Sequence, residues 1–152
     1  MLSYCYDKIQ RVELYFIKVL KMKLFCKAKD GGLESKVTGY WLIESKKFFS
    51  IVLLKFDEGS REAYHTHAFD AISWVFKGQL MEHSITNNED KTTFFNPSIM
   101  PIITPRSKFH RVFGTSKTTW ALSFRGPWID EWKEYIPASN KDITLTHGRR
   151  EV

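Results

Sequence analysis

Apolar and polar residues alternate in short runs along most of the chain after residue 35. Glycine, proline or clusters of polar residues separate each run from the next. Strict alternation is typical of strands that bury one face, because neighbouring side chains of a strand point to opposite sides. The pattern therefore predicts many short β-strands, at 36–45, 47–56, 63–68, 71–77, 79–86, 92–96, 99–104, 109–114 and 118–124.

The segment PWIDEWKEY, residues 127–135, is the exception to this pattern. Pro127 suits the first turn of a helix, and Asp130 and Glu131 would lie near its positive N-terminal end. We therefore predict a short C-terminal helix. Turns at intervals of roughly eight to twelve residues indicate an all-β sandwich or barrel. No internal repeat or linker interrupts the pattern, so we predict a single domain over 31–152.

Residues 1–30 differ from the rest of the chain because they mix large apolar residues with basic ones. They hold seven Lys/Arg and three Asp/Glu, whereas the other 122 residues hold sixteen and fourteen. We predict that residues 1–30 form a basic extension or a covering segment, as an amphipathic helix or as a first strand at a sheet edge. The body of the protein is close to neutral. The near-neutral body does not favour the clustered basic surface that binds a nucleic-acid backbone, so we expect no nucleic-acid partner.

Composition supports a folded protein in a reducing compartment. Hydrophobic residues make up 43% of the chain and aromatic residues 15%, which is typical of a globular fold rich in strands. Cys5 and Cys26 lack the spacing of metal ligands, and we expect two reduced thiols. No apolar run reaches the roughly 18 residues that span a bilayer. Lysines interrupt the apolar segment near the start, so we expect no secretory signal, no membrane partner and a cytoplasmic location.

Three histidines provide the main candidate chemistry. His65 and His67 are two positions apart in a predicted strand, so their side chains would share a face. A third histidine, His110, lies five positions after Pro105. Neutral imidazole nitrogens bind zinc, iron, copper or nickel. Exposed loop histidines and a hydrogen-bonded core histidine would be the structural alternative, but the glycines and proline around these residues favour a metal site.

These residues resemble the first motif of the cupin superfamily. That motif has a glycine, five residues, the sequence His-x-His, three or four residues, a glutamate, six residues and a second glycine. Here Gly59, the histidine pair and Gly78 keep this spacing. In the second cupin motif a histidine follows a proline by five positions, as His110 follows Pro105, although Ser107 stands where the motif has glycine.

Three longer segments are similar to a group of small, uncharacterised cupin proteins of phages and bacteria. These segments are HTHAFDAISWVFKG, TPRSKFHRV and LSFRGPW. The resemblance implies a cupin-type double-stranded β-helix, a jelly-roll barrel, with a divalent metal at its centre. Cupin barrels often pair sheet to sheet, and exposed strand edges need protection. We therefore expect a homodimer.

The glutamate of the first motif is missing. Its position falls on Ala71, and Asp70 is one residue away, on the opposite face of a regular strand. Either a bulge turns Asp70 towards the histidines, or three histidines alone hold the metal. We favour three histidines, which resembles the cysteine-dioxygenase branch of the cupins and its ferrous iron. Fe(II) is therefore the first expectation, with Zn, Mn and Ni as alternatives.

The resemblance favours a metal-dependent enzyme, similar to an Fe(II) dioxygenase, that acts on a small polar molecule in the barrel. Two alternatives remain open: a non-enzymatic cupin that binds a nucleotide or sugar, and a metal-free isomerase or epimerase. His83 could line the same cavity or act as a base. Arg106 and Arg125 could hold an anionic substrate through paired hydrogen bonds, although Arg125 could instead fix the predicted C-terminal helix.

Overall fold

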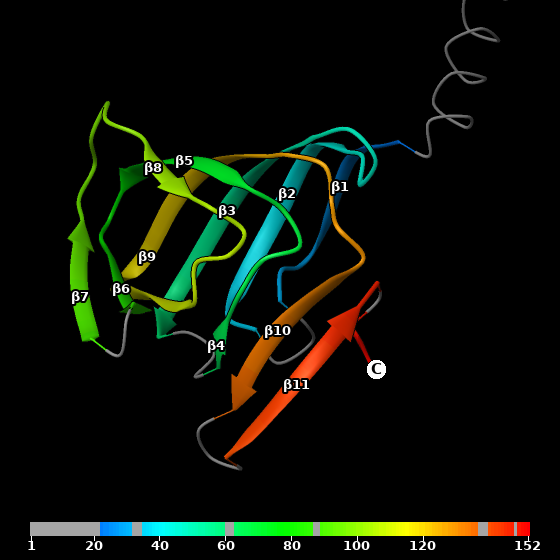
Figure 1. Ribbon diagram of the computed structural model, residues 1–152. Helices are drawn as coiled ribbons and strands as arrows, with labels where there is room; N and C mark the ends of the chain where they lie inside the picture. Colours follow the sequence, from blue (N-terminus) through cyan, green and yellow to red (C-terminus); the bar gives the residue numbers. More distant parts are fainter. Residues whose placement is uncertain (1–21, 32–34, 60–62, 87–88, 137–139, 148) are drawn as a thin grey trace, which may run out of the picture.

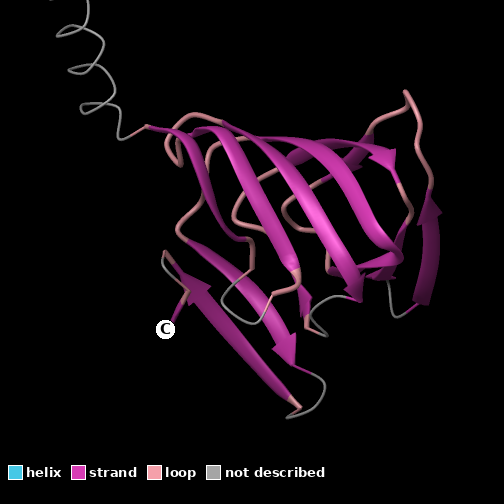
Figure 2. Ribbon diagram, turned by 180° about the vertical axis from the view of Figure 1, so that it is seen from behind, coloured by secondary structure: helices cyan, strands magenta, loops and turns pink. Residues whose placement is uncertain are grey.

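The described part of the chain consists of strands and loops. The computed structural model describes residues 22–31, 35–59, 63–86, 89–136, 140–147 and 149–152. Figures 1 and 2 show opposite sides of the molecule, in which the strands surround a common interior. The strands are β1 (Lys23–Lys29), β2 (Val37–Glu44), β3 (Ser50–Gly59), β4 (Tyr64–His65), β5 (Ala71–Lys77), β6 (Leu80–Thr86), β7 (Glu89–Phe95), β8 (Ile102–Thr104), β9 (His110–Arg125), β10 (Glu131–Ile136), β11 (Lys141–Thr146) and β12 (Arg150–Glu151).

The long strand β9 connects two parts of one continuous sheet that contains the twelve described strands. Its second half pairs with β3 on one side and β5 on the other, in the part of the sheet that also contains β1, β2 and β8. Its first half pairs with β6 and, at His110, with β4, which leads to β10 and β11. The alternation of residues predicts two strands here, at 109–114 and 118–124. They form one strand because the backbone of β9 continues through the polar residues 115–117.

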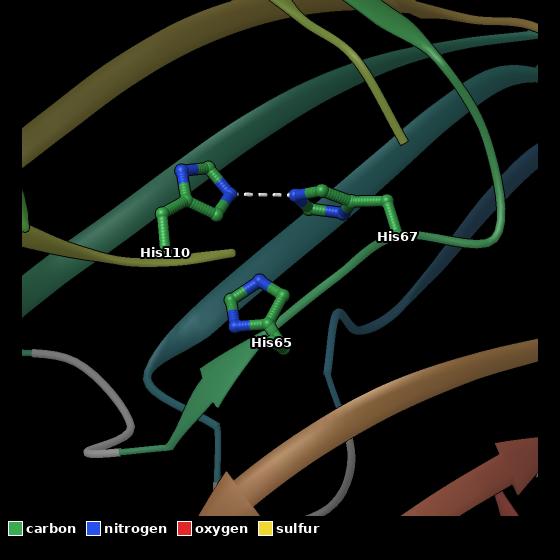
Figure 3. Close-up of side chains that lie close together, drawn as sticks. All are labelled: His65, His67 and His110. Atoms are coloured by element: carbon green, nitrogen blue, oxygen red, sulfur yellow. Dashed lines mark hydrogen bonds between the residues drawn. The ribbon is translucent and has the colours of Figure 1, made fainter. Parts of the chain in front are cut away.

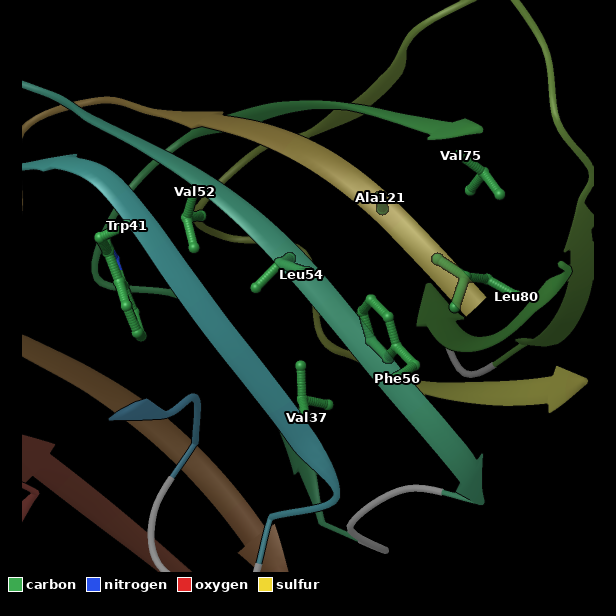
Figure 4. Close-up of a cluster of buried hydrophobic side chains, with 8 residues drawn as sticks. All are labelled: Val37, Trp41, Val52, Leu54, Phe56, Val75, Leu80 and Ala121. Atoms are coloured by element: carbon green, nitrogen blue, oxygen red, sulfur yellow. The ribbon is translucent and has the colours of Figure 1, made fainter. Parts of the chain in front are cut away.

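Alternating side chains of these strands fill the interior. Along β3 the buried apolar positions are Val52, Leu54 and Phe56, whereas the residues between them are partly exposed. These three side chains join others from β2, β5, β6 and β9 in the main core cluster (Figure 4). Val52 is fully buried. The period of two that predicts these strands therefore also identifies the side that faces the core.

The predicted C-terminal helix is wrong. Residues Glu131–Ile136 form β10, which pairs with β4 and β11. Trp132 and Glu134 are buried, whereas Glu131 and Lys133 are exposed, so burial follows the two-residue period of a strand. Helix-start signals are weak local preferences, and pairing with two neighbouring strands overrides them. Trp132 packs in a second core cluster with Phe69 and Leu145.

The last part of the predicted N-terminal segment is a strand. β1 pairs antiparallel with β2, for example Cys26 with Trp41, and so covers the edge of that strand. Cys26 is a free thiol, and Cys5 lies outside the described residues, as does the rest of 1–21. The domain limits and the homodimer stay predictions. No helix in the described ranges has the length and apolar character needed to cross a membrane.

Candidate metal centre

The fold brings His65, His67 and His110 together. His65 ends β4 and is the direct partner of His110 at the start of β9. His67 lies in the loop after β4, where its backbone N–H donates to the carbonyl oxygen of Arg106 over 3.0 Å. One ring nitrogen from each histidine lies within 4.8 Å of the other two. Figure 3 shows the three rings pointing toward a common centre.

The predicted strand over 63–68 is shorter than expected. Only Tyr64 and His65 are in β4, so the shared strand face does not explain how His67 reaches the other two rings. The loop does so instead: Thr66 donates its backbone N–H to the carbonyl oxygen of Lys133 on β10 over 2.9 Å. Its hydroxyl oxygen accepts the N–H of the same lysine at 2.8 Å. This anchor on β10 fixes the loop between the two histidines.

Hydrogen bonds on the outer nitrogens leave the inner nitrogens available. Nδ1 of His65 lies 3.2 Å from the carbonyl oxygen of Ala63, and Nδ1 of His110 contacts the carboxylate of Glu82. Donation from Nδ1 leaves a lone pair on Nε2, which is the state that binds a metal. The Nε2 atoms of His67 and His110 are 2.7 Å apart. At this distance the two rings share a hydrogen bond, which His110 accepts on Nε2 when its Nδ1 donates to Glu82, and a cation bound there would replace the shared proton.

Glu82 is the site residue that sequence analysis missed. It is 2% exposed, and its second oxygen accepts a hydrogen bond from Nζ of Lys108 at 2.6 Å. Burial alone would raise the pKa of Glu82, but the hydrogen bonds from His110 and Lys108 hold that pKa below its ordinary value. The carboxylate therefore stays charged and orients the imidazole of His110. One feature of the sequence indicates its position: Glu82 is two residues after the apolar Leu80 in β6, so both side chains point to the same, buried side.

The three histidines line part of a cavity of about 570 Å³. This volume is typical of small-molecule sites. Core side chains such as Leu54 and Phe56 form much of its wall, and Glu82 and Arg125 are among its polar residues. The cavity can therefore hold a small molecule against the histidines while apolar surface surrounds most of it.

The other predicted site residues lie in different places. Asp70 accepts hydrogen bonds from the backbone N and the Nε of Arg106, at 2.8 and 2.9 Å, on the protein surface. These bonds hold the pKa of Asp70 below its usual value. His83 is half-buried beside Arg111 and Phe113. None of these residues is part of the cavity lining.

We expect the substitution Asp70→Asn to leave metal binding unchanged. The Asp70 carboxylate is about half exposed and paired with Arg106, so it does not approach the three rings. Metal analysis of the purified variant, with titration of the metal-free protein, would measure this. A loss of affinity as large as that of a histidine variant would mean that a local rearrangement makes Asp70 a ligand.

Comparison with known proteins identifies the fold in which this site lies. No family model matches the chain, and no curated protein matches it. Solved structures do match. A sugar phosphate isomerase of the cupin superfamily from Silicibacter pomeroyi has a TM-score of 0.58 and 11% identity, covering 86% of this chain and 91% of its own. The chain has the cupin fold. The predicted cupin-type barrel is therefore confirmed.

Structures of two further enzymes also match. HppE with Fe(II) and substrate has a TM-score of 0.54 and 9% identity, covering 66% of this chain and 55% of its own. Oxalate oxidase in complex with glycolate has a TM-score of 0.51 and 16% identity, covering 69% and 57%. The match thus spans little more than half of these longer chains. At such identities the likeness concerns the fold, and the predicted phage or bacterial subgroup and cysteine-dioxygenase-like branch stay predictions.

Proposed function

We propose that this protein is a metal-dependent enzyme, similar to an Fe(II) dioxygenase, that acts on a small polar molecule inside the barrel. One observation supports this most strongly. Three imidazoles from separate parts of the chain converge within 4.8 Å at the wall of a cavity of about 570 Å³. Imidazoles are costly to gather in a partly buried site unless a bound ion or a hydrogen-bond network satisfies them.

The donor set suits a divalent transition metal. Neutral imidazole nitrogen is a good ligand for iron, zinc and nickel, and three such ligands leave coordination positions for substrate. With metal–nitrogen bonds of roughly 2.0–2.1 Å, two ligands at right angles would have nitrogens roughly 3 Å apart. The two Nε2 atoms at 2.7 Å are already close to that spacing. A bound metal would polarise substrate and supply redox chemistry if it is iron.

The protein's own residues would prepare this site in two ways. Glu82 holds the ring of His110 through Nδ1, which fixes the direction of Nε2 and increases its basicity. The apolar wall limits the access of bulk water to the reacting groups.

The structural comparisons suggest two candidate reaction classes. HppE has been solved with Fe(II) and has this fold, which favours an iron enzyme. The sugar phosphate isomerase covers most of both chains, which favours an isomerase as the second candidate. In that case His83 is a poor candidate for the base, since it is not part of the cavity lining. Glu82 is the buried carboxylate beside the cavity.

Anaerobic loading with Fe(II) tests the proposed function. We expect one iron per chain, and we expect nitric oxide to give the electron paramagnetic resonance signal of a high-spin iron–nitrosyl centre, because open coordination positions accept it. The His83→Ala variant should give the same signal. A protein that binds no iron, or binds it without a nitrosyl signal, would contradict the proposal and favour the isomerase or the non-enzymatic binder.

A further inference from the structure

The cavity has a second polar end, centred on Arg125. This arginine ends β9, the strand that begins with His110, and its side chain is 6% exposed. It lines the same cavity as the histidines. Its guanidinium carbon lies 4.6 Å from the ring centre of Phe69, and the His67 ring packs 5.3 Å from that same ring. Phe69 therefore separates a buried cation from the candidate metal centre.

The carboxylate of Asp30 occupies the hydrogen-bonding edge of this arginine. Nη1 and Nη2 of Arg125 donate to the two oxygens of Asp30 over 3.2 and 2.6 Å. This paired geometry is the one that guanidinium groups use to bind carboxylate and phosphate ligands. Asp30 follows β1 directly, and its side chain is 28% exposed, whereas that of Arg125 is almost fully buried. Asp30 thus lies between the arginine and solvent.

The surroundings of Arg125 offer more donors than acceptors. Nε of Arg125 and Nε1 of Trp128 are buried and lack a hydrogen-bond partner among the described residues. The Trp128 ring packs against the ring of Phe69, with 5.3 Å between the ring centres. Nζ of Lys46 lies 4.4 Å from the centre of the Trp128 ring. Buried donors without acceptors are rare and costly. Within the described ranges, six Lys/Arg and three Asp/Glu line the whole cavity, which favours an anion.

We propose that Arg125 is the anion-recognition residue of the cavity, and that an anionic group of the substrate displaces the carboxylate of Asp30 from it. The substrate class is then a small molecule with a carboxylate or phosphate group, held at Arg125 and Trp128 while its other end reaches the three histidines. This rests on the proposed function for the substrate's reacting end, but anion binding at Arg125 does not require a metal. Asp30 is an internal competitor that lowers the apparent affinity for the anion.

Titration of the metal-free full chain with inorganic phosphate and, separately, with acetate tests this inference. The readout is the indole N–H signal of Trp128 in two-dimensional nitrogen–proton spectra, assigned by its loss in the Trp128→Phe variant. We expect at least one anion to shift this signal in a saturable way, at constant ionic strength. The anion that binds more tightly identifies the substrate class as phosphate-bearing or carboxylate-bearing.

Variants separate recognition from a purely structural ion pair. Arg125→Lys keeps the charge but loses the paired geometry, so we expect anion affinity to fall about tenfold or more. Asp30→Asn removes the competitor, so affinity should rise by about the same factor. Arg106→Lys and His83→Ala, two residues that do not line the cavity, should change nothing.

Two results would overturn the inference. One is a Trp128 signal that neither anion shifts. The other is an Asp30→Asn variant that folds but binds anions no more tightly than the wild type, which would make the ion pair a purely structural link between β1 and β9. Because the wild-type titration and Asp30→Asn suffice for this decision, the test stands even if Arg125→Lys does not fold. Because the titration uses metal-free protein, a failure of anion binding leaves the metal assignment intact, and a failure to bind Fe(II) leaves this inference intact.

Discussion

Replacing His67 with alanine should reduce metal affinity by more than about 100-fold, because loss of even an outer partner of a metal ligand typically costs 10- to 100-fold. The three histidines supply three nitrogen donors, and no other His, Cys, Asp or Glu joins this cluster in the described part of the chain. Little redundancy therefore remains when one ring is removed. Metal analysis of the purified protein and competition titration of the metal-free protein would measure the effect.

The matched control for this experiment is His83→Ala. It removes the same side chain from a half-buried position on β6, where the ring contacts Phe113 rather than the other histidines. We expect this variant to bind metal as the wild type does. Full metal occupancy in His67→Ala would refute the ligand assignment, and equal losses in both variants would show that the effect is not local to the site.

Removing the carboxylate of Glu82 should have the largest effect on stability. In Glu82→Ala, the buried ring of His110 and the ammonium of Lys108 lose their acceptor together. Breaking a buried charged pair from one side typically costs about 3–5 kcal/mol. We expect a decrease of that size in the free energy of unfolding, measured by urea denaturation, and a metal affinity about 10- to 100-fold lower.

Two further variants show whether Glu82 acts through its charge or through its shape. Glu82→Gln keeps an oxygen acceptor for His110 but loses the charge, so its losses should be smaller than those of Glu82→Ala. Asp70→Ala breaks an exposed ion pair with Arg106, which should cost at most about 1 kcal/mol. If Glu82→Ala were no more destabilised than Asp70→Ala, the buried carboxylate would not orient His110 as proposed.

The alternation of polar and apolar residues predicts most of the sheet correctly. Side-chain parity along β3 and β5 determines which residues face the core, and this information is local. The spacing of His65, His67 and His110 predicts their convergence for a different reason, since it resembles a known motif. The physical route is not the predicted one: the loop containing Thr66, held by β10, places His67.

What the sequence did not reveal depends on contacts between distant residues. Glu82 and His110 are 28 positions apart, and Arg125 and Asp30 are 95 apart. Local sequence patterns do not show which distant residues form such pairs. The same limit explains the wrong helix prediction that covers most of 131–136. Residues typical of a helix start favoured a helix there, but pairing with β4 and β11 makes the segment a strand. Asp70 and Arg106, both predicted near the site, instead satisfy each other.

The most direct test of the metal site is anomalous X-ray diffraction at the iron edge, from crystals of the full chain grown with Fe(II) under anaerobic conditions. The proposed site predicts one anomalous peak among the rings of His65, His67 and His110. The distance from the peak to each Nε2 should be close to the length of a zinc–imidazole bond, roughly 2.0–2.1 Å. A peak bound by other residues, or no peak between the three rings, would contradict the assignment of these histidines as a metal centre.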